Sequence, residues 1–469
     1  MRRSHVMLAG AVVVAGAAAL LGSRGSTSAE VRGAPLEPSD SSIAAGSGAI
    51  PGSTPGASSP AVVAKRTAVS LSELLDLGQL TLAAGGDHYE AVLKDGRHAV
   101  LTLDPGLQAY AEKLLSEARA PRGAIVAMAP DGRILALAGR RGETPKDSGP
   151  KDSGKDGKDG KDGKAATDAG KDTKAAAQAT NDGTFDWHLA TDVWAPAASV
   201  FKLVTASALV AAGVTPDDKV CFHGGIRSVL ESNLRDDKRD SRCESLMYGV
   251  AHSNNAILGK FAFQKLEPAS LVKFSHELGL ANGVLGSELT GSAGSVDIPA
   301  ARDLSFAQTA AGFSGSQLSA VGGALLAATF ADDGEQPVPR VIASIDGTAL
   351  PVPARRRAVT PEVARAVSKM MLATCEMGSA AKSFGKHQAI HVAGKTGTLT
   401  RTEPFYMEHS WFVGYAPAES PQIVVSVVLG NPENWHLRGH EAARRLIDRA
   451  IGHDKDRTTK ITSTRRVGW

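Results

Sequence analysis

The chain has 469 residues, of which 42% are apolar and 22% charged, and its formal net charge is +3 at pH 7. This length and apolar content suffice for one large or two ordinary domains with buried cores, which excludes a wholly disordered protein. The small net charge, and basic residues that are not clustered with aromatic ones, argue against nucleic acid as a partner.

The first 24 residues are typical of an export segment. Met1-Arg2-Arg3 precedes an apolar run from Val6 to Gly22. The run predicts either a cleaved signal peptide or an uncleaved membrane anchor, and its length does not decide between them. Both alternatives place the rest of the chain in the periplasm or on the outer face of the cytoplasmic membrane. Residues 25–66 are rich in Ser, Gly, Pro and Ala and are predicted to be a flexible linker.

Residues 67–100 are predicted to form a short ordered segment packed on the main domain. A helix is expected to follow, with Asp104 as its N-cap and Pro105 at its first position. Residues 123–139 read as a hairpin, because two apolar runs flank a Pro-Asp-Gly turn.

The stretch from about residue 141 to 183 interrupts this order with repeats of Lys, Asp and Gly. Its opposite charges balance and almost nothing in it could be buried, so it is predicted to be a disordered insertion without a specific ligand.

A long apolar helix is predicted from Trp194 to Gly213, with Pro196 just inside its start. Ser199 and Lys202 are three residues apart near its beginning, so their side chains share a helix face and can touch. A buried lysine must be paired or give up its proton, which suggests a nucleophile beside its own base. The Ser-x-x-Lys spacing also begins at other serines, none of which opens a long apolar helix: Ser148, Ser270, Ser379 and Ser383.

The remaining chain alternates helical and strand-like segments up to Ile451. Residues 409–430 predict two strands around a turn, and residues 439–452 an amphipathic helix. Central helices flanked by antiparallel strand pairs favour an α+β fold. Residues 456–469 are predicted to be a polar tail.

Two further motifs follow the Ser199 helix. Ser253 and Asn255 form a Ser-x-Asn motif at the start of an apolar helical stretch. A Lys-Thr-Gly-Thr run lies on a predicted strand and comprises Lys395, Thr396, Gly397 and Thr398. Ser-x-x-Lys, Ser-x-Asn and Lys-Thr-Gly in this order are the signature set of serine acyltransferases that act on penicillin.

The sequence therefore resembles the transpeptidase domain of penicillin-binding proteins, from roughly Leu101 to Gly452, and this domain is assigned to residues 101–455. The stretches "LTLDPGLQ", "ASVFK", "HSNNA", "KTGT" and "WFVGYAP" carry the resemblance. It implies an antiparallel sheet flanked by helices with an all-helical subdomain. It also implies a peptidoglycan DD-transpeptidase that needs no cofactor, binds stem peptides and β-lactams, and works beside cell-wall assembly proteins. Because the chain before Leu101 is too short for a glycosyltransferase, a monofunctional enzyme is implied.

The resemblance also implies roles for the motif residues. Ser199 would be the nucleophile and Lys202 its base, with a pKa lowered by burial and by Lys395. Ser253 would relay a proton to the leaving nitrogen, while Asn255 would hold Lys202 and bond a substrate amide. The substrate carboxylate would be bound by Lys395, with Thr396 and Thr398 beside it and Gly397 between them. The backbone N–H groups of Ser199 and Thr398 would form the oxyanion hole.

The chain departs from the family pattern in two places. The family usually has Pro-Gly-Ser before the nucleophile, whereas this chain has Ala197 and Ala198 between Pro196 and Ser199. The Lys/Asp/Gly insertion also falls in a connection that is normally shorter. Neither departure removes a predicted catalytic group, but the sequence does not predict how wide the entrance of the site is.

The same sequence also suggests rival functions and one rival site. A β-lactamase is disfavoured because no Glu-x-x-x-Asn segment lies between Asn255 and Lys395. A DD-carboxypeptidase and a non-catalytic β-lactam sensor or scaffold remain alternatives. His436, His440 and Glu441 imitate metal-ligand spacing, but Gly439 interrupts the helix that would align the two histidines, so no metal is expected.

The three cysteines permit one disulfide. An exported chain meets an oxidising compartment, which favours a bridge between Cys221 and Cys243 and leaves Cys375 free. Three reduced, buried cysteines are the alternative.

Overall fold

The central element of the protein is a six-stranded antiparallel sheet in the order β16-β17-β18-β4-β5-β6. This computed structural model describes residues 70–142 and 183–464, apart from residues 282, 284, 386–388 and 404; for residues 453–464 only the backbone is described. The predicted export segment, the predicted linker and nearly all of the predicted insertion lie outside these residues. The strands are β4 (Arg122–Met128), β5 (Ile134–Arg141), β6 (Thr184–Phe185), β16 (Ala393–Arg401), β17 (Met407–Ala416) and β18 (Ile423–Asn431).

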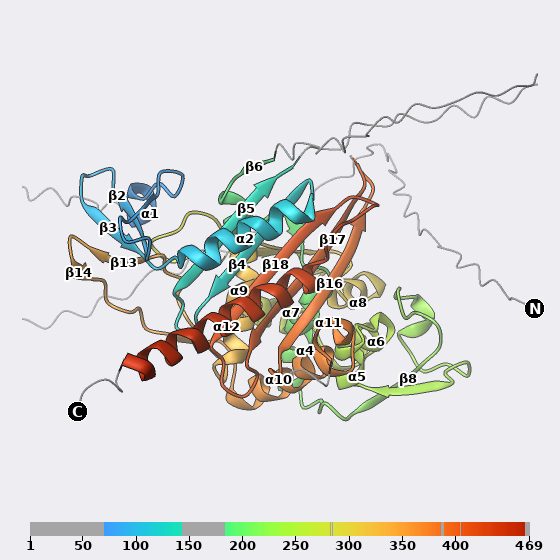
Figure 1. Ribbon diagram of the computed structural model, residues 1–469. Coiled ribbons are helices and arrows are strands. Elements are labelled where there is room, and N and C mark those ends of the chain that lie inside the picture. The colour runs from blue at the N-terminus through green and yellow to red at the C-terminus, as the bar shows by residue number, and fades with distance from the viewer. Residues whose placement is uncertain are drawn as a thin grey trace, which may run out of the picture. The chain divides into compact units, whose positions relative to one another are not determined.

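Helices cover both faces of this sheet (Figure 1). One face carries α2 (Pro105–Ala118) and α12 (Gly439–Thr464), and the other carries α9 (Ala320–Ala331). The alternation of side chains along β18 separates the two cores, because Val425 and Val427 pack beneath α2 and α12 while Val424 and Val428 belong to the opposite core. The predicted α+β fold, with an antiparallel sheet between helices, is confirmed.

A helical region adjoins the α9 face of the sheet and contributes most of the segments around the motifs. Its helices are α3 (His188–Thr191), α4 (Lys202–Ala211), α5 (Leu246–Ala251), α6 (Asn255–Lys265), α7 (Pro268–Glu277), α8 (Leu304–Ala310) and α10 (Pro361–Glu376), with short 3-10 turns η1 (Ala198–Phe201) and η2 (Glu231–Asn233). The short helix α11 (Ala381–Phe384) packs against α12, and Phe384 belongs to the core beneath α2 and α12. Three small sheets complete this region: β10 (Gly294–Val296), β11 (Ser316–Leu318) and β7 (Ala195–Pro196); β12 (Glu335–Gln336) and β15 (Arg356–Arg357); β8 (Lys219–Phe222) and β9 (Arg242–Ser245).

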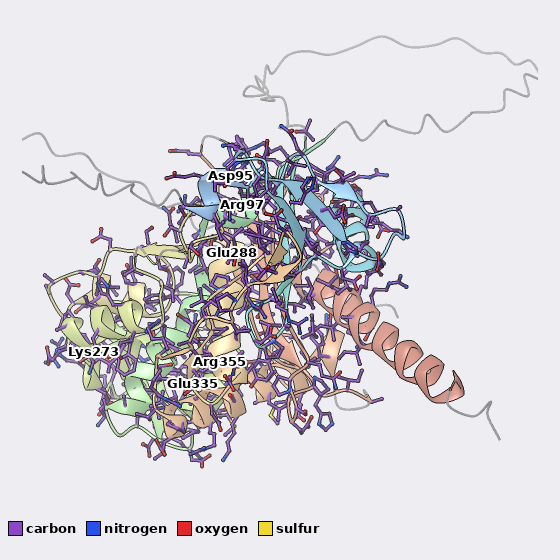
Figure 2. All side chains as sticks on the ribbon, turned by 90° about the vertical axis from the view of Figure 1, so that its left-hand side faces the viewer. Asp95, Arg97, Lys273, Glu288, Glu335 and Arg355 are labelled. Atoms are coloured by element: carbon purple, nitrogen blue, oxygen red, sulfur yellow. A yellow bond between two sulfur atoms is a disulfide. The ribbon has the colours of Figure 1, made fainter. Side chains whose placement is uncertain are left out.

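The segment before the main domain is described from residue 70 and joins the main domain by strand pairing. It contains α1 (Leu71–Leu74), β1 (Thr81–Leu82), β2 (Tyr89–Val92) and β3 (His98–Leu101). β3 pairs with β13 (Ile342–Ile345), which in turn pairs with β14 (Thr348–Ala349). This five-stranded sheet lies at one end of the fold, where Asp95, Arg97 and Glu288 are labelled (Figure 2). There the buried carboxylate of Glu288 accepts hydrogen bonds from the backbone N–H groups of Val341 and Ile342 at 2.6 and 2.8 Å.

Several local predictions are confirmed. Asp104 caps α2 by accepting a hydrogen bond from the Leu107 N–H at 2.9 Å, and Pro105 is the first helical residue. β4 and β5 form the predicted hairpin, and β17 and β18 the predicted strand pair. The amphipathic helix α12 is present and continues to Thr464, into residues predicted to be a polar tail.

The predicted start of the Ser199 helix is wrong. Pro196 belongs to strand β7, which pairs with β11, and a 3-10 turn precedes α4, which begins only at Lys202. The Trp411 indole N–H also donates to the Pro196 carbonyl at 2.8 Å, so tertiary contacts hold this stretch extended. Ser199 therefore lies on a tight turn rather than inside a helix.

The predicted disulfide between Cys221 and Cys243 is present. The two residues lie directly opposite each other in the β8–β9 pair, with their Cα atoms 3.9 Å apart. Cys375 is free and buried. We expect that alkylation of the unreduced, denatured protein will modify Cys375 alone, as counted by mass spectrometry. Modification of all three cysteines would contradict the bridge, and a reduced sample provides the control for complete reactivity.

The two ends that flank the predicted insertion are neighbours. Arg141 of β5 pairs with Thr184 of β6 in antiparallel register, so a short turn can join the two strands. We therefore expect that replacing residues 143–182 with a four-residue Gly/Ser turn will change the rate of acylation by penicillin less than about twofold. Stopped-flow acylation of the shortened and full chains compares them, and a loss of tenfold or more would show that the segment takes part in the site.

Candidate functional site

The three sequence motifs meet at the junction between the helical region and the edge strand β16. Ser199 and Lys202 come from η1 and the first residue of α4, Ser253 and Asn255 from the turn before α6 and its first residue, and Lys395 from β16. η1 packs against β16, and α4 packs against α6. Residues of the motifs that lie up to 142 positions apart are thus brought within hydrogen-bonding distance.

Lys202 is the centre of this arrangement. Its side chain is fully buried, and its Nζ donates to Ser199 Oγ at 2.8 Å, to Asn255 Oδ1 at 2.7 Å and to the carbonyl of Ala311 at 2.6 Å. Burial, and then the positive charge of Lys395, holds the pKa of Lys202 well below its ordinary value. A neutral amine in contact with a serine hydroxyl can take up the hydroxyl proton.

Lys395 is the second buried lysine of the site. Its Nζ donates to Ser253 Oγ at 3.1 Å and to the carbonyl of Thr396 at 2.9 Å. Burial lowers the pKa of Lys395 to about 7. Each polar residue of the Ser-x-Asn motif therefore binds one lysine, Asn255 binding Lys202 and Ser253 binding Lys395.

The turn that carries Ser253 is held by the residue after it. Ser253 has a φ of 56°, in the left-handed region that few non-glycine residues adopt. The side chain of Asn254 caps α6 by accepting from the Ile257 N–H at 3.2 Å. The segment between Cys221 and Cys243 also supplies backbone carbonyls that bind the first N–H groups of α6. One of them is the Ile226 carbonyl, which accepts from the Asn255 N–H at 3.2 Å. The Asn254 cap and the Ile226 carbonyl thus fix the backbone at the start of α6, from which the Asn255 side chain extends.

The Lys-Thr-Gly-Thr run lies on β16, the outer strand of the six-stranded sheet. β17 occupies one side of β16, which leaves the backbone groups of the other side facing the motifs. Thr398 is exposed and Thr396 half-buried, and Thr396 Oγ1 lies 2.6 Å from Ser379 Oγ. A Cβ on Gly397 would come within 3.2 Å of Val200, so glycine permits the close approach of β16 to η1.

Sequence reasoning missed residues that contact the motifs through the backbone or across the entrance. Gly312 has a φ of +87°, and a Cβ there would collide with the carbonyl of Ala198, the residue before Ser199. Ala311 supplies the carbonyl that binds Lys202, and Ser379 supplies the hydroxyl that binds Thr396. No side-chain pattern marks Ala311 or Gly312. The only sequence signal is their position in "FAQTAAGFSGSQLSA", a stretch typical of the family.

The departure at Ala198 has a structural consequence. Ala198 has a φ of 50°, in the left-handed region, and is fully buried. Glycine adopts this conformation without steric cost, which accounts for the usual Pro-Gly-Ser of the family. In this chain alanine occupies the left-handed position of the turn that presents Ser199.

The two histidines with metal-like spacing do not share a helix face. His440 is the second residue of α12, and His436 precedes that helix. Among the described residues, no group of three or more His, Cys, Asp or Glu side chains is placed to hold a metal ion. In the same residues, no helix combines the length and apolar character that crossing a membrane requires.

Comparison with known proteins identifies the class. Residues 123–450 match the model of the penicillin binding protein transpeptidase domain, and this chain belongs to that family. Two curated relatives are similar over part of their length: the peptidoglycan D,D-transpeptidase PbpA of Mycobacterium tuberculosis is 26% identical over 249 residues, which is 50% of each chain. The PbpA of Mycolicibacterium smegmatis is 27% identical over 259 residues, which is 50% of this chain and 49% of the relative. The matched region thus spans about half the length of these relatives.

Solved structures show the same fold. Penicillin-binding protein A from Mycobacterium tuberculosis, as an imipenem acyl-enzyme complex, superimposes with a TM-score of 0.56 at 22% identity, covering 76% of this chain and 80% of that one. Penicillin-binding protein 3 from Mycobacterium tuberculosis, complexed with aztreonam, gives a TM-score of 0.58 at 21% identity, covering 77% and 80%. The resemblance drawn from the motifs and the expected fold are therefore confirmed.

Proposed function

We propose that this protein is a monofunctional peptidoglycan DD-transpeptidase, which forms an acyl-enzyme from a D-Ala-D-Ala stem peptide and transfers the acyl group to an amine acceptor. The observation that carries the proposal is the contact between Ser199 Oγ and the buried Nζ of Lys202, whose pKa is held low. The family membership and the names of the PbpA relatives support the same reaction class.

Acylation begins at Ser199. Lys202 takes the proton from the Ser199 hydroxyl, and Oγ attacks the carbonyl carbon of the penultimate D-Ala. Backbone N–H groups of Ser199 and Thr398 stabilise the oxyanion of the tetrahedral intermediate. The C–N bond then breaks, the leaving D-Ala amine receives a proton through Ser253, and an ester remains on Ser199.

Deacylation reverses the proton path. The acceptor amine attacks the ester carbon, loses its proton through the same lysine and serine groups, and forms the new amide. The Ser199 oxygen regains a proton as the ester C–O bond breaks. No atom or electron pair from a cofactor is needed for this cycle.

Substrate binding falls to the residues around β16. Lys395 attracts the terminal carboxylate, Thr396 and Thr398 bond it, and the free edge of β16 pairs with the peptide backbone. Asn255 bonds a substrate amide while it holds Lys202. β-Lactams would acylate Ser199 in the same way, as relatives of this fold form acyl-enzymes with imipenem and penicillin G. The reaction places the enzyme outside the cytoplasm with cell-wall assembly proteins as partners, either anchored or released by signal-peptide cleavage.

The pKa of Lys395 predicts the pH dependence of this binding. Lys395 is a cation below its pKa of about 7 and neutral above it, so attraction for a carboxylate is present below pH 7 and lost as the pH rises through that value. We expect the second-order rate constant of acylation by benzylpenicillin to decline above about pH 7. Lys395→Arg keeps its charge at every pH tested, so its rate, although lower, should show no alkaline decline. An unchanged alkaline limb in that variant would contradict the assignment.

The deciding experiment measures the fate of the acyl-enzyme. The purified full chain is incubated with a donor stem peptide and an amine acceptor, and cross-linked and hydrolysed products are quantified by mass spectrometry. A transpeptidase yields mainly cross-linked product, whereas a DD-carboxypeptidase yields hydrolysed product and a sensor yields neither.

Matched serine variants locate the reaction. Ser199→Ala should abolish both products and the covalent penicillin adduct. Ser207→Ala removes a buried hydroxyl of α4, the helix that begins at Lys202; this hydroxyl donates to the Leu203 carbonyl, and the variant should retain activity. An adduct mapped to Ser253, or its persistence in Ser199→Ala, would overturn the mechanism.

A further inference from the structure

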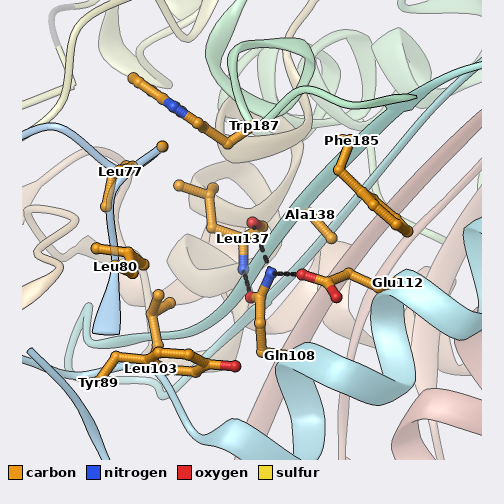
Figure 3. A pocket seen from close by; sticks show the side chains of 12 residues that line it. Leu77, Leu80, Tyr89, Leu103, Gln108, Glu112, Leu137, Ala138, Phe185 and Trp187 are labelled. Carbon is orange, nitrogen blue, oxygen red and sulfur yellow. Dashed lines mark hydrogen bonds between the residues drawn. The ribbon is translucent and has the colours of Figure 1, made fainter. Parts of the chain in front are cut away.

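A pocket lies where the segment that contains α1, β1, β2 and β3 meets the main sheet, and none of its lining residues belongs to the three motifs. Its volume is about 270 Å³, and its walls come from the chain between α1 and β3, from α2, from β5 and from the residues that follow Gly183 (Figure 3). Sites for drug-sized molecules usually measure about 300–1,000 Å³. This pocket therefore suits one large side chain better than a whole ligand.

The floor of the pocket is Gln108, whose amide covers the edge of β5. Gln108 Oε1 accepts from the Leu137 N–H at 2.8 Å, and Nε2 donates to the Leu137 carbonyl at 3.2 Å and to Glu112 Oε1 at 2.8 Å. Both amide hydrogens are thus used within the protein. Gln108 cannot supply the hydrogen-bond donor for a ligand.

Glu112 is the charged group of the pocket. It is half-buried, it lies beside Gln108 across from Trp187 (Figure 3), and it forms no ion pair with any residue that the structure describes. The other glutamate of α2, Glu117, is paired with Arg445 at 2.7 Å and Lys113 at 3.9 Å. The free oxygen of Glu112 therefore leaves the pocket with an unbalanced negative charge and a vacant acceptor.

Aromatic side chains form the opposing walls. Tyr89, Phe185 and Trp187 line the pocket, and Phe185 is 53% exposed. Leu82 lies directly opposite Tyr89 in the β1–β2 pair, which places both on one face, and is 48% exposed. Apolar surface thus continues from the pocket onto its rim, as it does around the anchoring pockets of protein interfaces.

We propose that this pocket binds an arginine side chain presented by a partner protein. A guanidinium stacks flat on aromatic rings and donates a charge-assisted hydrogen bond to a carboxylate oxygen, so it matches Trp187, Phe185 and the free oxygen of Glu112 together. A lysine ammonium is more strongly hydrated and has no planar face to stack on these rings. The apolar neighbours of the arginine would pack on Leu82 and Phe185 at the rim.

The test uses three short peptides and the full chain. Ac-Leu-Arg-Leu-NH₂, its lysine counterpart and its citrulline counterpart are titrated at low ionic strength by calorimetry. We expect the arginine peptide to bind saturably and the other two at least about tenfold more weakly. Glu112→Gln should weaken binding of the arginine peptide about tenfold, whereas Glu117→Gln, on the same helix but outside the pocket, should leave it unchanged.

A third variant and two folding controls complete the binding test. Trp187→Leu should also weaken binding, and thermal melting together with penicillin acylation shows that each variant is folded. Absence of saturable binding up to the solubility limit, equal binding by Glu112→Gln, or equal binding of the citrulline or lysine peptide would each overturn the proposal.

Discussion

Replacing Lys202 with arginine will lower the rate of acylation by penicillin at least about a hundredfold, the usual scale for loss of a general base. A guanidinium stays protonated at every accessible pH, so it can donate to Ser199 Oγ but cannot take its proton. The low pKa of Lys202, caused by burial and by Lys395, is what the substitution removes. Stopped-flow measurement with a fluorescent penicillin gives the rate.

Lys260 provides the matched control. It is as deeply buried as Lys202, but its Nζ binds Asp240 and the Cys221 carbonyl, each at 2.7 Å. Lys260→Arg should keep acylation within about threefold of the parent chain, and thermal melting of both variants separates lost chemistry from lost folding. If Lys202→Arg acylates at a near-parental rate, Lys202 is structural.

Gly312→Ala is expected to lower acylation about a hundredfold although Gly312 carries no reactive group. An added Cβ would collide with the Ala198 carbonyl and come within 3.2 Å of the Ser199 N–H nitrogen. The turn that presents Ser199 must then shift, and a displacement of about 1 Å at a reacting group can cost a factor of about a hundred. The same shift would move the Ser199 N–H out of the oxyanion hole.

Gly213→Ala separates this effect from backbone strain. Gly213 has a φ of +89°, nearly that of Gly312, but no atom lies within 4 Å of its added Cβ. Both variants should lose stability from the strained φ, as measured by thermal melting, and Gly312→Ala should lose more because of the collision, while only Gly312→Ala should lose acylation. Equal acylation by the two variants would show that the contact with Ala198 does not matter.

Local signals sufficed for much of the fold. The Asp104 cap, the Pro-Asp-Gly hairpin and the apolar runs of β17 and β18 could be predicted because neighbouring residues decide them. The disulfide could also be predicted from the sequence, since its two cysteines are near in sequence and lie opposite each other in one antiparallel strand pair. The start of the Ser199 helix could not be predicted, because Trp411, more than 200 residues away, holds Pro196 in a strand.

The order of three short motifs was enough to predict which groups make up the candidate site. The sequence could not show the protonation state of the two lysines. Burial lowers the pKa of Lys395, and burial together with the charge of Lys395 lowers the pKa of Lys202; only the packing of α4, α6 and β16 creates these surroundings. The tertiary structure likewise decided the roles of Ala311 and Gly312, since a backbone carbonyl and a missing Cβ leave no side-chain pattern to read. Contacts between distant segments set the dielectric, the distances and the allowed backbone angles, and these are properties of the packed site rather than of any residue in it.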